Sequence, residues 1–143
     1  MKIAIGSDHA GFSLKVILKN YLEEKGIQVN DFGTFTEESV DYPDFAHPVA
    51  ESVEKKEVDF GIIMCGTGNG INIAANKHKG IRAALCWNSD IAILSRQHND
   101  ANILTLPARF ISKEDAIKCV ESFINTLFEG GRHSGRVKKI SDF

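Results

Sequence analysis

Short apolar runs alternate with segments of helical periodicity along the whole chain, and this alternation limits the fold more than any other feature. The expected strands are residues 2–6, 27–33, 58–64, 81–87 and 102–107, and the expected helices are residues 12–26, 45–56, 71–80, 89–100 and 112–131. Strand–helix–strand units connect parallel strands by right-handed crossovers, which place helices on both faces of the sheet. The sequence therefore predicts one five-stranded parallel sheet between two layers of helices.

Local signals indicate where several of these helices begin and end. Gly26 is a stop signal for the first helix, and Pro48 favours a helix start near that position. Ser89 and Ser112 are expected to be N-caps because serine hydroxyls accept hydrogen bonds from free amides in the first turn.

Composition is typical of an ordinary globular protein with one domain, residues 1–143. The 143 residues are 43% hydrophobic and 25% charged, and the net charge of −2 gives no reason to expect nucleic acid as a partner. No apolar run approaches the length of a membrane span, and the N-terminus lacks a signal-peptide core. Three widely spaced cysteines without a CxxC pair favour reduced thiols, so we expect a cytoplasmic protein.

Polar residues follow the expected strands where each of them ends. Asp8 and His9 follow the first strand, Tyr42 lies in the loop after the second, CGTGNG (65–70) follows the third, and Arg109 follows the fifth. The carboxyl ends of parallel strands share one edge of a sheet, where such folds bind ligands. We therefore expect a ligand site at this edge.

The CGTGNG loop contains three glycines at alternate positions between a strand and a helix. Amides in such a turn point into a concavity that suits either a phosphate or an oxyanion that forms during a reaction. The alternative is a tight turn that serves only the packing of the helix on the sheet. A nucleotide-binding motif is disfavoured, because Ile71 interrupts the GxGxxG pattern and no GK[ST] motif is present.

Cys65 differs from the other two cysteines in its position. It ends a strand beside a helix N-terminus, where a thiolate is stabilised, so it is a candidate nucleophile or base. Cys86 lies inside an expected strand and Cys119 inside an expected helix, and both are expected to be packing residues.

The histidines and arginines divide in a similar way. His47 and His78 lack an evident partner and are expected at the surface or in caps, whereas His9 and His98 are candidates for ligand contact or catalysis. No spacing of histidines and carboxylates matches a known metal motif, so we expect no metal and no cofactor. Arg132 and Arg136, with Arg109, could bind a phosphate through their planar donors, and Lys138 and Lys139 are expected to be solvated.

The segments SDHAGF, DYPDFA, CGTGNGINIAANKHKGIRAA, SRQHNDANIL and FEGGRHSGRV occur in an order and spacing that closely resemble the ribose-5-phosphate isomerase B and galactose-6-phosphate isomerase family. The resemblance covers nearly the whole chain. It implies a Rossmann-like three-layer α/β/α sandwich and a metal-independent homodimer or dimer of dimers. The active sites would lie between subunits, with residues 129–143 completing the phosphate site or the dimer interface.

The resemblance also implies roles for individual residues. Cys65 would be the base that moves a proton between C1 and C2 of a sugar phosphate, Thr67 would assist at the substrate oxygens, and His98 would open the sugar ring. The amides of Gly66, Gly68, Asn69 and Gly70 would bind the enediolate. Substrate contacts would come from Asp8, His9, Tyr42 and Asn99, and phosphate contacts from Arg109, Arg132 and Arg136.

These matches favour an enzyme that interconverts ribose 5-phosphate and ribulose 5-phosphate in the pentose phosphate pathway. A hexose 6-phosphate such as allose or galactose 6-phosphate is the alternative substrate. A sugar-phosphate sensor without catalytic activity is a further alternative. The presence of Cys65, Thr67 and His98 weighs against the sensor, which would need only the arginines and the loop.

Overall fold

The computed structural model describes residues 1–143 and contains one parallel sheet with the strand order β2-β1-β3-β5-β4. Its strands are β1 (Lys2–Ser7), β2 (Gln28–Asp31), β3 (Phe60–Cys65), β4 (Ala83–Leu85) and β5 (Ile103–Pro107). All four pairings are parallel, and β3 lies at the centre between β1 and β5. The prediction of a five-stranded parallel sheet is confirmed.

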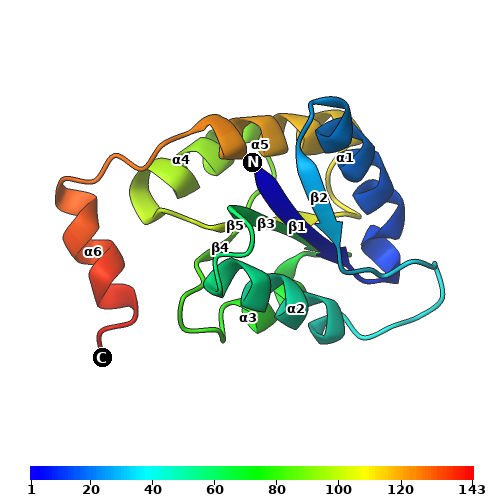
Figure 1. Ribbon diagram of the computed structural model, residues 1–143, viewed down its shortest axis with the longest axis horizontal. Coiled ribbons are helices and arrows are strands. Elements are labelled where there is room, and N and C mark those ends of the chain that lie inside the picture. Colours follow the sequence, from blue (N-terminus) through cyan, green and yellow to red (C-terminus); the bar gives the residue numbers. More distant parts are fainter.

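Helices cover both faces of this sheet and form three layers (Figure 1). One face carries α1 (Phe12–Glu24), α4 (Ser89–Asn99) and α5 (Lys113–Asn125), and the other carries α2 (Pro43–Glu54) and α3 (Asn69–Ala75). A short 3₁₀ helix, η1 (His9–Gly11), connects β1 to α1. Strands β1, β3 and β5 face apolar layers on both sides, which explains their nearly continuous hydrophobic runs, whereas the edge strand β2 is only partly buried.

Four of the expected helix boundaries are wrong. The expected helix 71–80 ends early, since α3 ends at Ala75. Helix α2 begins at Pro43 rather than near Pro48, because a proline in the first turn needs no amide hydrogen bond. Asn88, not Ser89, caps α4, and its side chain accepts a hydrogen bond from the Ile91 amide. The expected helix 112–131 begins correctly after the Ser112 cap but ends at Asn125.

A second C-terminal helix, α6 (Arg132–Ile140), follows the break after α5. Gly130 and Gly131 in the connection both have positive φ, a conformation that glycine adopts without steric cost. The helix lies at the far left of Figure 1, away from the sheet, and contacts mainly α4. Its only buried residue is His133.

None of the helices combines the length and the apolar character needed to cross a lipid bilayer.

The packing on the α1–α4–α5 face yields a stability prediction. Phe123 is fully buried and meets Phe60 edge-on with ring centroids 5.3 Å apart. We expect Phe123→Ala to reduce the free energy of unfolding by about 3–5 kcal/mol, because the truncation leaves a cavity. Urea titration at fixed protein concentration measures this change.

Val16→Ala is the matched control for this truncation, since Val16 lies on the exposed side of α1. We expect its effect to stay within about 0.5 kcal/mol. Similar losses in the two variants would contradict the assignment of Phe123 to the core.

Candidate active site

Pairing of β1, β3 and β5 brings three predicted site segments together at the carboxyl edge of the sheet. Ser7 of β1 is in register with Met64 of β3, and Cys65 is in register with Pro107 of β5. Asp8 therefore lies beside the start of the glycine loop, and its amide donates to the Met64 carbonyl at 3.4 Å. Cys65 itself is buried at this point.

The glycine loop packs tightly against its neighbours. Gly68 has φ of 78°, in the left-handed region, and α3 begins at the next residue. A Cβ atom at Gly68 would lie 2.5 Å from the Leu85 side chain and 3.2 Å from the backbone of Leu106. The tight turn expected as the purely structural alternative is therefore real, and it fixes the directions of the loop amides.

Two predicted binding residues contact glycines of the same loop. The ring of Tyr42 lies over Gly70, where an added Cβ would be 2.5 Å from it. The Arg109 side chain lies over Gly66, and the Arg109 amide donates to the Gly66 carbonyl at 3.0 Å. These contacts place Tyr42 and Arg109 in the same half of the site as Cys65.

The polar side chains around this loop have free hydrogen-bonding capacity. Oδ1 of Asp8 accepts bonds from the amides of Ala10 and Gly11, whereas Oδ2 takes part in neither bond. Nδ1 of His9 accepts from the Val40 amide at 3.1 Å, so the neutral ring carries its proton on Nε2. The Thr67 hydroxyl accepts from the Asn69 amide at 3.2 Å and keeps its own proton available to donate.

The remaining predicted residues lie at the opposite end of the molecule. His98 and Asn99 are the last residues of α4, which ends before β5 begins, and Arg132 and Arg136 lie on α6. The rise per residue makes β5 roughly 13 Å long between its first and last Cα atoms. Because Cys65 is level with the last residue of β5, one chain cannot bring Cys65 and His98 onto one small ligand.

Two arginines hold the end of α4 in position. Arg96 donates from Nη1 to the Asp100 carboxylate at 2.8 Å and from Nε to the Thr126 carbonyl at 3.1 Å. Arg82 donates from Nε to the carbonyls of Asn99 and Asp100. Asp100 itself is left-handed with φ of 46°, which ends the helix. His98 and Asn99 therefore project from a well-anchored helix end.

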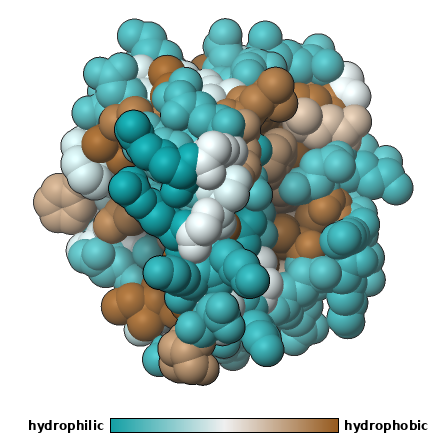
Figure 2. Space-filling view, turned by 90° about the vertical axis from the view of Figure 1, so that its left-hand side faces the viewer, coloured by the Kyte–Doolittle hydropathy of each residue, from teal (hydrophilic) through white to brown (hydrophobic).

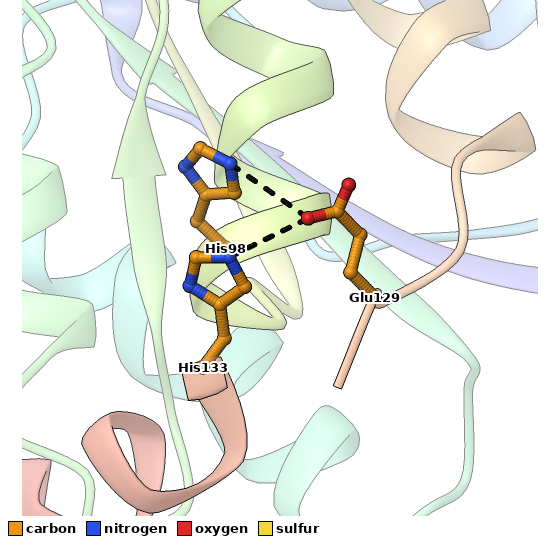
Figure 3. Close-up of side chains that lie close together, drawn as sticks. All are labelled: His98, Glu129 and His133. Carbon is orange, nitrogen blue, oxygen red and sulfur yellow. Dashed lines mark ion pairs between the residues drawn. The ribbon is translucent and has the colours of Figure 1, made fainter. Parts of the chain in front are cut away.

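His98 has two close neighbours that the sequence patterns did not single out, Glu129 and His133 (Figure 3). The His98 and His133 rings are stacked with centroids 4.4 Å apart and planes 16° apart. Burial lowers the pKa of His133, and the adjacent His98 lowers it further. The four-residue spacing of Glu129 and His133 was the available signal, but it becomes informative only once α4 is known to lie alongside.

His47 and His78, which have no evident partner in the sequence and are expected at the surface or in caps, are half-buried and contact each other. His47 Nδ1 lies 2.7 Å from His78 Nε2, and His78 Nδ1 lies 3.3 Å from the Glu54 carboxylate. A hydrogen bond from the Gly80 amide lowers the pKa of Glu54. This chain of contacts joins the end of α2 to the segment after α3, on one side of the sheet.

Comparison with known proteins identifies the family to which the chain belongs. Residues 3–140 match the family model described as Ribose/Galactose Isomerase. Ribose-5-phosphate isomerase B of Escherichia coli is 49% identical over 140 residues, which cover 98% of this chain and 94% of the relative. These matches show that the chain is an isomerase and that it belongs to the ribose/galactose isomerase family.

Solved structures agree with this assignment. A ribose 5-phosphate isomerase from Thermotoga maritima superposes with a TM-score of 0.98 at 57% identity, covering 99% of this chain and 98% of that chain. The Mycoplasma genitalium ribose-5-phosphate isomerase B with bound ribulose 5-phosphate superposes with a TM-score of 0.94 at 45% identity, covering 99% and 94%. The expected three-layer fold and the expected family are confirmed.

The three thiols differ in environment, which yields a labelling prediction. Burial raises the pKa of Cys86 to about 12 and that of Cys119 to about 11. Both are 0% exposed, whereas Cys65 is 5% exposed at the edge of the glycine loop. At pH 8 only about one Cys86 thiol in 10⁴ is a thiolate, the form that alkylates.

We expect iodoacetamide at pH 8 to label Cys65 first in the folded protein and to leave Cys86 and Cys119 unmodified. Peptide mass spectrometry over time measures the three rates, and urea-unfolded protein should label at all three positions. Labelling of Cys86 or Cys119 in the folded protein at the rate of Cys65 would contradict these environments.

Proposed function

We propose that the protein is an aldose–ketose isomerase that interconverts ribose 5-phosphate and ribulose 5-phosphate through an enediolate. The observation that carries the proposal is the buried thiol of Cys65 at the start of a tight amide-lined loop, in a chain of the ribose/galactose isomerase family. We further propose that the reaction takes place in the cytoplasm, where the three unpaired cysteines stay reduced.

Cys65 is proposed as the base. The reaction removes a weakly acidic proton next to a carbonyl group and returns it to the neighbouring carbon, so one base near C1 and C2 serves both steps. The thiolate takes the proton from C2 of the open-chain aldose, and the electron pair forms the enediolate. The hydroxyl proton of O2 passes to O1, and the thiol returns its proton to C1, which leaves the carbonyl group at C2. The position of Cys65 at the end of a central strand holds its sulfur in a fixed place.

The glycine loop is proposed to bind the enediolate. Gly66, Gly68, Asn69 and Gly70 supply amides on a backbone that close packing holds rigid. One such donor contributes about 3 kcal/mol to stabilising a developing oxyanion. The free proton of Thr67 is suited to donate to a substrate oxygen, and the free atoms of Asp8 and His9 are suited to the sugar hydroxyls. Tyr42 borders the same loop.

The second half of the site is proposed to come from another copy of the chain. His98 opens the furanose ring, Asn99 contacts the sugar, and Arg132 and Arg136 bind the phosphate. Arg109, beside Gly66, supplies a further cation from the first copy. Opposite ends of one chain carry the two halves, so a symmetric dimer, alone or paired into a tetramer, completes two sites at once.

The surface beside α6 supports this arrangement. A 690 Å³ cavity lies between α6 and the segment joining α3 to β4, with Ile140 and Phe143 among its lining residues. The face of the molecule that carries α6 shows apolar surface beside a hydrophilic band (Figure 2). Residues 129–143 are therefore proposed to complete both the phosphate site and the dimer interface.

The isomerase proposal is tested by activity in EDTA. We expect the purified protein to convert ribose 5-phosphate to ribulose 5-phosphate, and Cys65→Ala to lower kcat by at least about 100-fold because the base is lost. Cys119→Ala, which removes a buried thiol far from the loop, should retain wild-type kcat. Full activity of the Cys65 variant would refute the assignment of the base.

The same assay compares ribose 5-phosphate with allose and galactose 6-phosphates. The family model names both ribose and galactose isomerases, so a hexose phosphate is the second candidate substrate. A higher kcat/KM for a hexose phosphate would replace the pentose assignment. No turnover of any of the three would favour a binding protein without catalytic activity.

The shared site makes a prediction about mixed dimers. Cys65→Ala and His98→Ala homodimers should both be impaired, whereas a heterodimer of the two contains one site with both native residues. Co-expression should therefore restore up to about one quarter of wild-type activity in a two-fold symmetric dimer. A mixture no more active than its parents would show that the halves do not combine across subunits.

A further inference from the structure

The structure contains two groups that each combine two histidines and a glutamate, and their geometries differ. In the first, His47 Nδ1 faces His78 Nε2 at 2.7 Å, while Glu54 lies on the other nitrogen of His78. These atoms form a line and do not converge on one point. In the second group, both imidazoles of the His98–His133 stack face the same carboxylate (Figure 3).

We propose that His98, Glu129 and His133 form a binding site for one divalent cation of the zinc type, and that its occupation inhibits the isomerase. The cation site rests on geometry alone. Only the inhibition rests on the proposed function, through the role of His98 in ring opening.

The distances in the second group suit a small transition-metal ion. His133 Nε2 lies 3.4 Å and His98 Nε2 lies 3.9 Å from Glu129 Oε1, and the three ligand atoms all lie within 4.8 Å of one another. Bonds of 2.0–2.1 Å to a tetrahedral Zn²⁺ place its ligands about 3.4 Å apart. The 3.4 Å between His133 Nε2 and Glu129 Oε1 already matches this spacing. A modest rotation of the His98 side chain brings its Nε2 to the same ion.

Backbone contacts hold the three residues close before any ion binds. The Glu129 amide donates to the Gln97 carbonyl in the last turn of α4 at 3.2 Å, and the His133 amide donates to the Gly130 carbonyl at 3.0 Å. His98 extends from the helix end that Arg82 and Arg96 anchor. The connection between α5 and α6 is thus tied to α4 next to His98.

The site is open to an incoming ion. His133 is largely buried, but the side chains of His98 and Glu129 are 39% and 50% exposed. A 310 Å³ cavity lined by His98, Asn99, His133 and Arg136 adjoins them. Three protein ligands leave the fourth tetrahedral position to a water molecule in this cavity.

The donor atoms determine the kind of metal. Two imidazole nitrogens with one carboxylate suit Zn²⁺, Co²⁺, Ni²⁺ or Cu²⁺, whereas Mg²⁺ and Ca²⁺ prefer oxygen ligands throughout. Arg132 and Arg136 lie on the same helix as His133 and oppose the binding of any cation. The Glu129 carboxylate is the one negative ligand that offsets this charge, so the site depends on it.

An ion bound here takes the lone pair of His98 Nε2. A coordinated nitrogen cannot accept or donate the proton that ring opening requires, so the ion and the sugar phosphate compete for the same imidazole. Glu129 and His133, which are not among the residues proposed to move a proton in the reaction, would thereby make the enzyme sensitive to excess transition metal.

Calorimetric titration of ZnCl₂ into EDTA-stripped protein tests the site without reference to activity. The Cys65→Ala background removes the most accessible thiol as a competing ligand. In that background we expect one ion per chain, with affinity reduced at least about 10-fold by Glu129→Gln. Glu54→Gln, the same change in the other group, should leave the affinity unchanged. An affinity that Glu129→Gln does not alter, or no binding at all, would overturn the proposal.

Two further readouts separate the site from the function. Co²⁺ should give the visible absorption of a tetrahedral complex in the Cys65→Ala protein and lose it with Glu129→Gln. In the protein that retains Cys65, Zn²⁺ should inhibit isomerisation at the concentrations at which it binds. For Glu129→Gln, with activity measured relative to that variant without metal, half-inhibition should need at least about 10-fold more Zn²⁺. If Zn²⁺ binds without inhibiting the enzyme, the inhibitory role is wrong. If the metal-free protein has no isomerase activity, the proposed function is wrong, but the cation site still stands.

Discussion

Hydrogen bonding of β3 between β1 and β5 is the constraint on which the site depends. Because all three strands run in the same direction, their last residues meet at one edge and bring Asp8, Cys65 and Arg109 together. The same direction sends α4 back to the other edge before β5 begins. Sheet topology therefore separates the thiol from the His98 imidazole, whatever the details of the loops.

Buried ion pairs fix the segments that the sheet alone would leave free. Lys15 is almost fully buried, and its ammonium contacts both carboxylate oxygens of Asp31 at 2.7 Å. Asp31 also accepts from the Gly33 amide, which orders the start of the loop that leads to Tyr42. Arg96 has a corresponding role at the other end of the sheet, where its guanidinium stacks on Phe60 and binds Asp100. Removing one partner of either pair would leave a charge buried without a partner, which would lower the free energy of unfolding.

Much of the fold and of the carboxyl-edge site could be predicted from the sequence, because the signals are local. Periodicity located five strands, and residues directly after a strand necessarily lie at its end. The boundaries that failed lacked a clear local signal. Asn88 competes with Ser89 as a cap, and the helix after Ser112 ends at Asn125, where Thr126 is already extended, well before the glycines Gly130 and Gly131. Glu129 and His133 could not be predicted as neighbours of His98, because that contact depends on how α6 packs on α4. No local sequence pattern encodes this packing.

Helix α6 buries a single residue against its own chain, although it carries Arg132 and Arg136, two of the three arginines proposed to bind phosphate. Nine residues with so little apolar burial gain little free energy from their own fold to offset the entropy of ordering. In the proposed dimer the missing burial comes from the partner subunit, so the order of α6 and the association of subunits become linked equilibria. Dilution would then melt the phosphate site before it unfolds the sheet, and substrate phosphate would in turn favour assembly.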